Sequence, residues 1–208
     1  MLDDIVYANT IAALINGKIR GDFTDLNESE IEKFFDKFQK DKGTLRFIEY
    51  YNKTVLDKEK ISFGEFKSRW GIQGMTREFY SYFDENYDKI KEEITSDKNI
   101  RAFFEKYCSK ERKEGTFCSK LFHTFLPSEF PPIDAAIRRR FCIQNEDLIA
   151  SVLIVKKSYD LFSKENPNAI KRIRKVLSKE KFAYLRSDEL SDMRILDMYY
   201  WFKENRNK

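Results

Sequence analysis

The stretch TFCSKLFHTFLPSEFPPIDAAIRRRFC, residues 116–142, combines an apolar segment, three prolines and three consecutive arginines. Proline restricts the backbone and disfavours a helix at the residue before it, so the apolar helix expected over 116–126 must end near Leu126. Asp134 then stands at the N-cap position of the next helix, where its carboxylate can accept hydrogen bonds from backbone amides of the first turn. The stretch therefore predicts two helices joined by a rigid turn.

Helical periodicity continues on both sides of this stretch, and we find no convincing strand alternation and no repeat. The expected helices cover 3–16, 28–41, 44–57, 76–94, 98–109, 146–164, 167–181 and 192–205. Residues expected at helix ends are Gly17, Asn27, Asn145, Pro167 and Ser191. The sequence thus predicts an all-α, two-lobed protein of about ten helices.

Composition sets limits on the class of protein. The chain has 208 residues, of which 41% are hydrophobic, so it can bury a sizeable core. No apolar run is long enough to span a membrane and the N-terminus does not resemble a secretory signal, so we expect a cytoplasmic protein without membrane contact. The cysteines are three and widely spaced, and there is one histidine. We therefore expect reduced thiols, no cofactor, and no metal or iron–sulfur cluster.

The net charge of +4 is unevenly distributed, with an acidic excess in residues 1–100 and a basic excess in 101–208. We expect an acidic N-terminal lobe over 1–95 and a basic C-terminal lobe over 96–208. A basic surface of this kind favours a polyanionic partner, DNA or RNA. Charged helices that are simply solvated remain the alternative, and we prefer it for the first half.

Lys120 interrupts the apolar segment between Phe117 and Phe125. One interpretation is that its stem lies on apolar surface and its ammonium reaches water. The other is that burial lowers the pKa of the amine and makes it a nucleophile. Taken alone, Lys120 fits the first interpretation better, and Asp134 taken alone needs no role beyond the helix cap.

Taken together, these residues resemble the segment that carries the chemistry in helix-hairpin-helix DNA glycosylases. In that family a glycine-containing hairpin precedes a lysine at the start of a helix, and an apolar-Pro-apolar-Asp element opens the next helix. Here Gly115 precedes Ser119 and Lys120, and PPIDAAIRRRF is similar to the Asp-containing element. The hairpin supplies one glycine, and the resemblance covers the region around residues 115–142.

The resemblance implies an all-α fold with two helical lobes around a substrate cleft. It also implies that Lys120 is the lysine that forms a Schiff base in bifunctional members and that Asp134 is the aspartate needed for base release. The protein would then be a glycosylase of base-excision DNA repair, with or without AP-lyase activity. The base must leave the stack to be reached, so an aromatic pocket is required. Aromatic residues available for it are Phe103, Phe104, Tyr107 and Phe122.

Basic residues near this segment are candidates for phosphate contacts. Together with Gly115 they are Arg138, Arg139, Arg140, Lys171, Arg172, Arg174 and Lys175. Ser119 and His123 are candidates to orient the catalytic groups, although a lone histidine on an apolar face is more often a core residue. Near the C-terminus, Arg194 and Asp197 can pair at i,i+3 of a helix.

Two non-catalytic interpretations stay open. The chain can be a helical module that binds nucleic acid through Arg138–Arg140 and Lys171–Lys181. It can also be a protein-interaction domain in which the basic half meets an acidic partner, or the first half of a second copy. The sequence leaves the lesion, the strand preference and the oligomeric state undetermined.

Overall fold

A computed structural model describes residues 2–24, 26–72, 77–107 and 115–205. Within these residues every regular element is a helix, which confirms the predicted all-α class. The first half contains α1 Leu2–Thr24, α2 Glu28–Gln39, α3 Lys42–Tyr51, a π-helical turn Asn52–Leu56, α4 Phe63–Trp70, α5 Arg77–Glu85 and α6 Tyr87–Asp97. The second half contains α7 Ile100–Tyr107, α8 Gly115–Phe125, α9 Ala135–Phe141, α10 Leu148–Glu165, α11 Pro167–Leu177, a 3₁₀ turn Glu180–Leu185 and α12 Asp192–Asn205.

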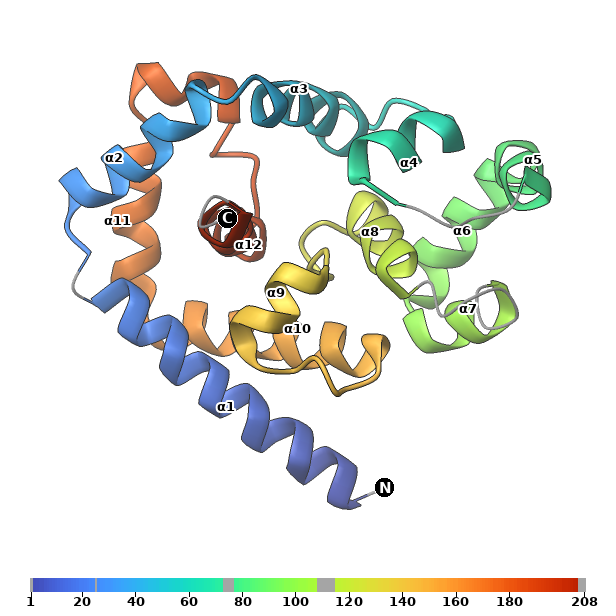
Figure 1. The fold of residues 1–208 in the computed structure, drawn as a ribbon, viewed down its shortest axis with the longest axis horizontal. Helices are drawn as coiled ribbons and strands as arrows, with labels where there is room; N and C mark the ends of the chain where they lie inside the picture. The colour runs from blue at the N-terminus through green and yellow to red at the C-terminus, as the bar shows by residue number, and fades with distance from the viewer. Residues whose placement is uncertain (1, 25, 73–76, 108–114, 206–208) are drawn as a thin grey trace.

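The C-terminal helix α12 lies at the centre of a ring of helices, where Figure 1 shows it end-on. It packs against α9 and α10, while α1 runs along α10 and α2 packs against α11 and α3. Helix α8 contacts α6, α7 and α10, so it joins this ring to the remaining helices. The lobe boundary at residue 95 stays a prediction, and the contacts of α1 with α10 and of α2 with α11 cross it.

The core is dominated by aromatic rings. Phe23 on α1 packs on Tyr199 of α12 with ring centroids 4.4 Å apart, and Phe38 on α2 packs on Phe202 at 4.2 Å. Each such buried ring contributes about 1.5–3 kcal/mol relative to leaving it in water. Helices α1 and α2 thus bury aromatic rings directly against α12.

Several predicted helix ends are confirmed. Asn27 accepts from the Glu30 amide at 3.0 Å while the Glu30 carboxylate accepts from the Asn27 amide at 2.9 Å, a complete capping box. Pro167 stands in the first turn of α11. The hydroxyl of Ser191 accepts from the Arg194 amide at 3.1 Å and so caps α12.

Other predicted ends were wrong. Gly17 does not end the first helix, because α1 continues to Thr24 with Ile15 and Ile19 buried on either side of the glycine. Burial of that face outweighs the small cost of a glycine in the helix interior. Asn145 does not cap the helix expected at 146–164; Asp147 does, through a bond of 2.8 Å from the Ala150 amide.

Two expected helices also have different lengths. The helix predicted over 76–94 is broken at Asn86, which separates α5 from α6. The helix predicted over 167–181 ends at Leu177 and is followed by the 3₁₀ turn. Hydrophobic periodicity alone cannot detect such breaks, because the helical segments on both sides of the break each have an apolar face with the same spacing.

Candidate functional site

The Pro-rich segment between α8 and α9 is held in place from both ends. Asp134 caps α9, with one carboxylate oxygen, Oδ1, accepting from the amides of Ala136 at 2.8 Å and Ile137 at 3.0 Å. The predicted cap is therefore confirmed. Both capping bonds use Oδ1, so the second oxygen of this half-buried carboxylate is not required by the cap.

Ser119 and His123, one turn apart on α8, bind the same segment through its main chain. The Ser119 hydroxyl accepts from the Ile133 amide at 3.1 Å, directly before Asp134. His123 bonds the Phe130 carbonyl through Nδ1 at 2.6 Å and the Tyr51 hydroxyl through Nε2 at 2.9 Å. A carbonyl only accepts, so Nδ1 carries the proton and Nε2 accepts. Burial lowers the pKa of His123 to about 3, so the ring is neutral.

These bonds define what the two predicted orienting residues do. Ser119 fixes the residue next to Asp134, and so supports the position of that carboxylate through the backbone. His123 is fully buried and its two ring nitrogens bond Phe130 and Tyr51. His123 therefore holds the turn against α3, as a satisfied core histidine does.

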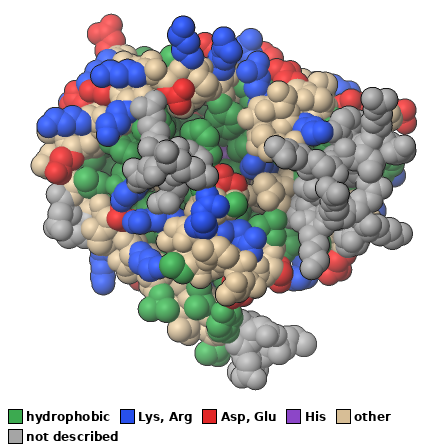
Figure 2. Space-filling view, in the orientation of Figure 1, with side chains coloured by type: hydrophobic (Ala, Val, Ile, Leu, Met, Phe, Trp, Pro, Cys, Tyr) green, Lys and Arg blue, Asp and Glu red, His purple; other side chains and the backbone are tan. Residues whose placement is uncertain are grey.

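A cavity of about 310 Å³ opens beside this segment, within the range of small-ligand sites. Lys120 and Asp134 both line it, together with residues of α3, α4 and α12. The complete lining is Asp41, Gly43, Thr44, Phe47, Arg69, Trp70, Lys120, Pro132, Asp134, Arg194, Asp197 and Trp201. Figure 2 shows a hollow near the centre of this face, with acidic atoms inside it and Lys and Arg side chains beside it.

Lys120 is buried, with 8% of its surface exposed, so the snorkelling interpretation does not describe it. Its Nζ donates to the main-chain carbonyl of Trp70 at 2.6 Å and lies 6.0 Å from the centre of the Trp70 ring. Burial lowers the pKa of the Lys120 amine, while the charges of Asp134 and Asp197 act in the opposite direction. The amine is therefore fixed in place and easier to deprotonate than an exposed lysine.

Aromatic side chains form the cavity wall, and they are not the ones expected from the sequence. Phe47 meets Trp70 edge-on at 4.9 Å and stacks beside Trp201 at 6.3 Å between ring centroids. The four rings suggested from the sequence are not among the lining residues. Two of these, Phe103 and Phe122, pack on each other in the core at 5.4 Å. Proximity to Lys120 in the sequence was a poor guide, because α3, α4 and α12 supply the wall.

Arg194 and Asp197 form the predicted i,i+3 pair on α12, and both line the cavity. The sequence did not indicate that this pair belongs to the site. Their side chains are only 6% and 3% exposed. The Arg194 guanidinium lies 4.3 Å from the centre of the Tyr51 ring. Two opposite charges within the apolar run MRILDMYYWF were the signal that could have identified them.

The three consecutive arginines have different surroundings. Arg138 donates to the main-chain carbonyls of Gln144, at 2.6 Å, and Glu146, which closes the turn after α9. Arg140 pairs with Asp22 of α1. Arg139 is exposed. Of the three, Arg139 has the surroundings best suited to a phosphate contact.

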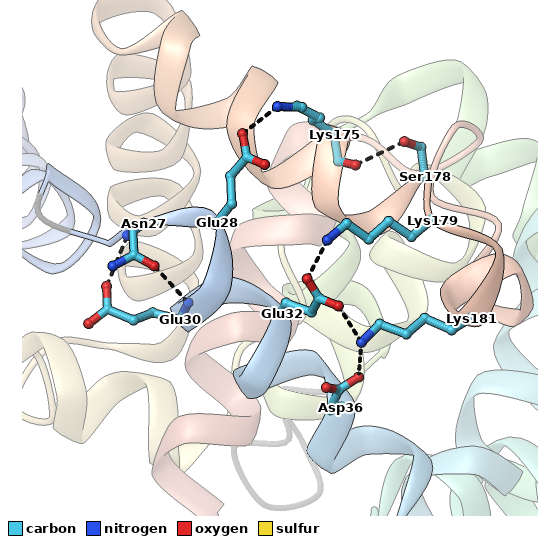
Figure 3. A network of polar contacts seen from close by, with 9 residues as sticks. All are labelled: Asn27, Glu28, Glu30, Glu32, Asp36, Lys175, Ser178, Lys179 and Lys181. Carbon is cyan, nitrogen blue, oxygen red and sulfur yellow. Dashed lines mark hydrogen bonds and ion pairs between the residues drawn. The ribbon is translucent and has the colours of Figure 1, made fainter.

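The lysines at the end of α11 and in the 3₁₀ turn that follows it face the acidic helix α2, as Figure 3 shows. Lys175 pairs with Glu28 at 2.6 Å, and Lys181 contacts both Glu32, at 2.5 Å, and Asp36, at 2.8 Å. Lys179 pairs with Glu32 as well. An acidic partner for this run is thus present within the chain itself.

The other residues predicted to contact phosphate differ in their surroundings, since some are bonded within the chain and one is exposed. Arg174 binds Asp192 and also donates to the carbonyls of Ser187 and Leu190, both at 2.8 Å, so its guanidinium already has three partners within the chain. Arg172 donates to the Phe23 carbonyl at 3.4 Å, and Lys171 is exposed. Gly115 begins α8. The rest of its expected hairpin, residues 108–114, lies outside the described residues.

Among the described residues, His, Cys, Asp and Glu side chains do not gather into a group of three or more that could hold a metal ion. None of the described helices has the length and apolar character needed to cross a membrane. Comparison with protein-family models, curated proteins and solved structures finds no match, so the resemblance to helix-hairpin-helix glycosylases stays a prediction.

Proposed function

We propose that this protein is a DNA glycosylase of the base-excision type, acting on damaged or modified DNA, with an associated AP-lyase activity. The observation that carries the proposal is that Lys120 and Asp134 line one cavity with aromatic walls. The two residues come from different elements, α8 and the cap of α9, and the turn between them is fixed by Ser119 and His123.

Asp134 has the properties needed to stabilise a developing positive charge. Cleavage of an N-glycosidic bond builds positive charge on the deoxyribose, and a fixed carboxylate stabilises that charge without having to reorganise. The two amides of α9 hold the Asp134 carboxylate in place through Oδ1. Its other oxygen is the one that would face the sugar.

Lys120 has the properties needed for the lyase step. A lysine attacks an aldehyde carbon only as the neutral amine, and burial favours that form. Attack on C1′ of an abasic site gives an imine with loss of water, and the imine permits strand cleavage by β-elimination. The hydrogen bond to the Trp70 carbonyl keeps Nζ at one position in the wall.

The aromatic wall is suited to a flat, flipped base. Phe47, Trp70 and Trp201 offer ring faces and edges on one side of the cavity, and stacking on such rings contributes about 1–3 kcal/mol per base. Arg69 at the cavity and the exposed Arg139 are the charges we expect nearest to the DNA phosphates.

Reductive trapping tests the proposal. The protein is incubated with a duplex that contains one abasic site, in the presence of borohydride, and the covalent adduct is resolved by denaturing electrophoresis. We expect an adduct with the native chain and none with Lys120→Gln. Lys156→Gln is the matched control, because Lys156 also donates to a main-chain carbonyl at 2.6 Å but does not line the cavity.

Circular dichroism must show that both variants fold. An equal yield of adduct from Lys120→Gln would contradict the role of Lys120. No adduct with the native chain, and no release of any base, would overturn the enzymatic proposal. Salt-dependent DNA binding without chemistry would then support the helical binding module.

A further inference from the structure

The proposed function gives no role to Arg194 and Asp197, the buried ion pair on α12 that lines the cavity. Arg194 and Asp197 are nearly inaccessible, and removing two charges from water costs several kcal/mol each before their attraction is counted. An apolar pair would fill the same space at lower cost, so packing alone does not explain these residues. Their position in the lining, next to Lys120 and Asp134, points to a role in the chemistry.

Charged and titratable groups approach Asp197 from every side of the cavity. Arg194 lies on the same helix, and Tyr51 of α3, Lys120 of α8, Asp134 at the start of α9 and Tyr159 of α10 interact with it electrostatically. Arg194 and Lys120 favour the carboxylate, whereas Asp134 disfavours it. Asp197 is thus more enclosed than Asp134, which lines the same cavity.

The two carboxyl groups have contrasting environments. Asp134 is half-exposed, and its Oδ1 accepts hydrogen bonds from two backbone amides. Asp197 is 2% exposed, and burial raises its pKa to about 7 even though Arg194 opposes the shift. Two carboxyl groups in different environments of one site can serve as an acid and as an electrostatic stabiliser.

We propose that Asp197 is the general acid that protonates the base as it leaves, an inference that rests on the proposed glycosylase function. As the bond between C1′ and the base nitrogen breaks, its electron pair passes to the base, and the carboxyl proton of Asp197 passes to a nitrogen or oxygen of that base. Asp134 faces the positive sugar, and Lys120 or water adds to C1′. The base departs neutral, and Asp197 is left as a carboxylate beside Arg194.

This assignment separates two reactions that the same cavity would perform. Release of a neutral base needs an acid, and a positioned general acid contributes about 10²–10⁴-fold. An abasic site has no base to release, so attack by Lys120 needs no proton from Asp197. Since the Asp197 charge raises the pKa of Lys120, removing it does not hinder formation of the neutral amine.

The test compares base release with adduct formation in the native chain, Asp197→Asn and Asp197→Glu. Single-turnover base release is measured on four duplexes that each contain one uracil, hypoxanthine, 8-oxoguanine or mispaired thymine, all of which are uncharged in the nucleotide. Adduct formation is measured by borohydride trapping on an abasic duplex. We expect Asp197→Asn to release the preferred base about 100-fold more slowly while forming the adduct at least as fast as the native chain.

The pH profile gives a readout that a structural role would not change. Base release by the native chain should fall as the pH rises above about 7, where Asp197 loses its proton. Base release by Asp197→Asn should be slow and independent of pH in this range. Asp197→Glu should recover part of the rate of base release, and that rate should again decrease as the pH rises.

Each other outcome is decisive. Native-like base release by Asp197→Asn would overturn the inference and leave the glycosylase proposal standing. If Asp197→Asn loses base release and adduct formation equally, Asp197 only maintains the shape of the cavity, and the general-acid inference is overturned. If the native chain releases none of the four bases, Asp197 has no leaving group to protonate, and the glycosylase assignment is contradicted as well. If the native chain nevertheless forms the adduct, the proposed AP-lyase activity of Lys120 still stands.

Discussion

At Asp134 one carboxylate has two roles that substitution can separate. Oδ1 caps α9, and the charge of the group is what the proposed chemistry requires. Asparagine can accept the same two amide bonds but carries no charge, whereas alanine removes both the cap and the charge.

We therefore expect Asp134→Asn to unfold at nearly the same urea concentration as the native chain, and Asp134→Ala to lose about 1 kcal/mol of stability. Both variants should lose base release by a similar factor of 10² or more, on the order of one preorganised electrostatic group. Urea denaturation and single-turnover base release measure the two effects. A catalytically silent Asp134→Asn would leave Asp134 with the cap alone.

Burial of His123 makes the stability of the fold depend on pH. Its pKa is about 3 in the folded chain and 6.5 in the unfolded chain, because the buried ring cannot accept a charge. As the pH falls below about 6.5, the unfolded chain binds a proton that the folded chain does not. The contribution of His123 to stability is therefore complete above pH 6.5 and is lost as the pH falls, by about 1.4 kcal/mol per pH unit.

The difference in unfolding free energy between the native chain and His123→Asn isolates this effect. We expect the difference to be constant above pH 6.5 and to shrink by about 1.4 kcal/mol per unit below it. Burial raises the pKa of Asp197, so its contribution to the free energy of unfolding decreases as the pH rises toward 7. This contribution is the same in the native chain and in His123→Asn, and it therefore cancels in the difference. Urea denaturation between pH 4.5 and 7.5 provides the measurement, and a difference independent of pH would show that His123 is not enclosed as described.

At the scale of single elements, caps were the most predictable features, and helix continuity was the least. The capping box at Asn27, the cap at Asp134 and the start of α11 at Pro167 follow from local chemistry, and the structure shows all three. Gly17 was misjudged because a glycine ends a helix only where the chain adopts a left-handed backbone. Gly71 does so after α4, with φ of 62°, whereas Gly17 lies within α1.

These two glycines predict opposite responses to alanine. A Cβ at Gly17 meets nothing within 4 Å, so Gly17→Ala should stabilise the protein by about 0.5–1 kcal/mol through helix propensity. Gly71→Ala should cost about 1–2 kcal/mol, since alanine does not favour a positive φ. Thermal and urea denaturation measure both changes. A destabilising Gly17→Ala would mean that α1 is not continuous through this position.

At the scale of the whole molecule, the candidate segment could be proposed from the sequence, but the cavity around it could not. Lys120 and Asp134 were selected because residues 115–142 resemble the segment of helix-hairpin-helix DNA glycosylases, whereas each residue taken alone indicated no chemistry. Phe47, Trp70 and Trp201 could not be selected, because they come from α3, α4 and α12 and meet only when these helices pack. Residues far apart in the sequence are brought together by burial of many apolar faces at once, and no short window contains that information.

Charge complementarity within the chain also appears only at this scale. The acidic excess of the first half and the basic excess of the second meet directly in the pairs that α2 forms with α11 and with the 3₁₀ turn after it. Exposed pairs of this kind contribute about 0–1 kcal/mol each, so their main consequence is to occupy basic groups that would otherwise face an outside polyanion.

Mapping the covalent bond in the trapped complex tests the central claim most directly. The native chain is reduced onto an abasic duplex, digested with protease and nuclease, and the modified residue is located by tandem mass spectrometry. The shared cavity predicts a deoxyribose remnant on Nζ of Lys120, and a marked loss of that product in Asp134→Asn on a base-containing duplex. A remnant on an exposed lysine or on the N-terminal amine, with Lys120 unmodified, would contradict the account.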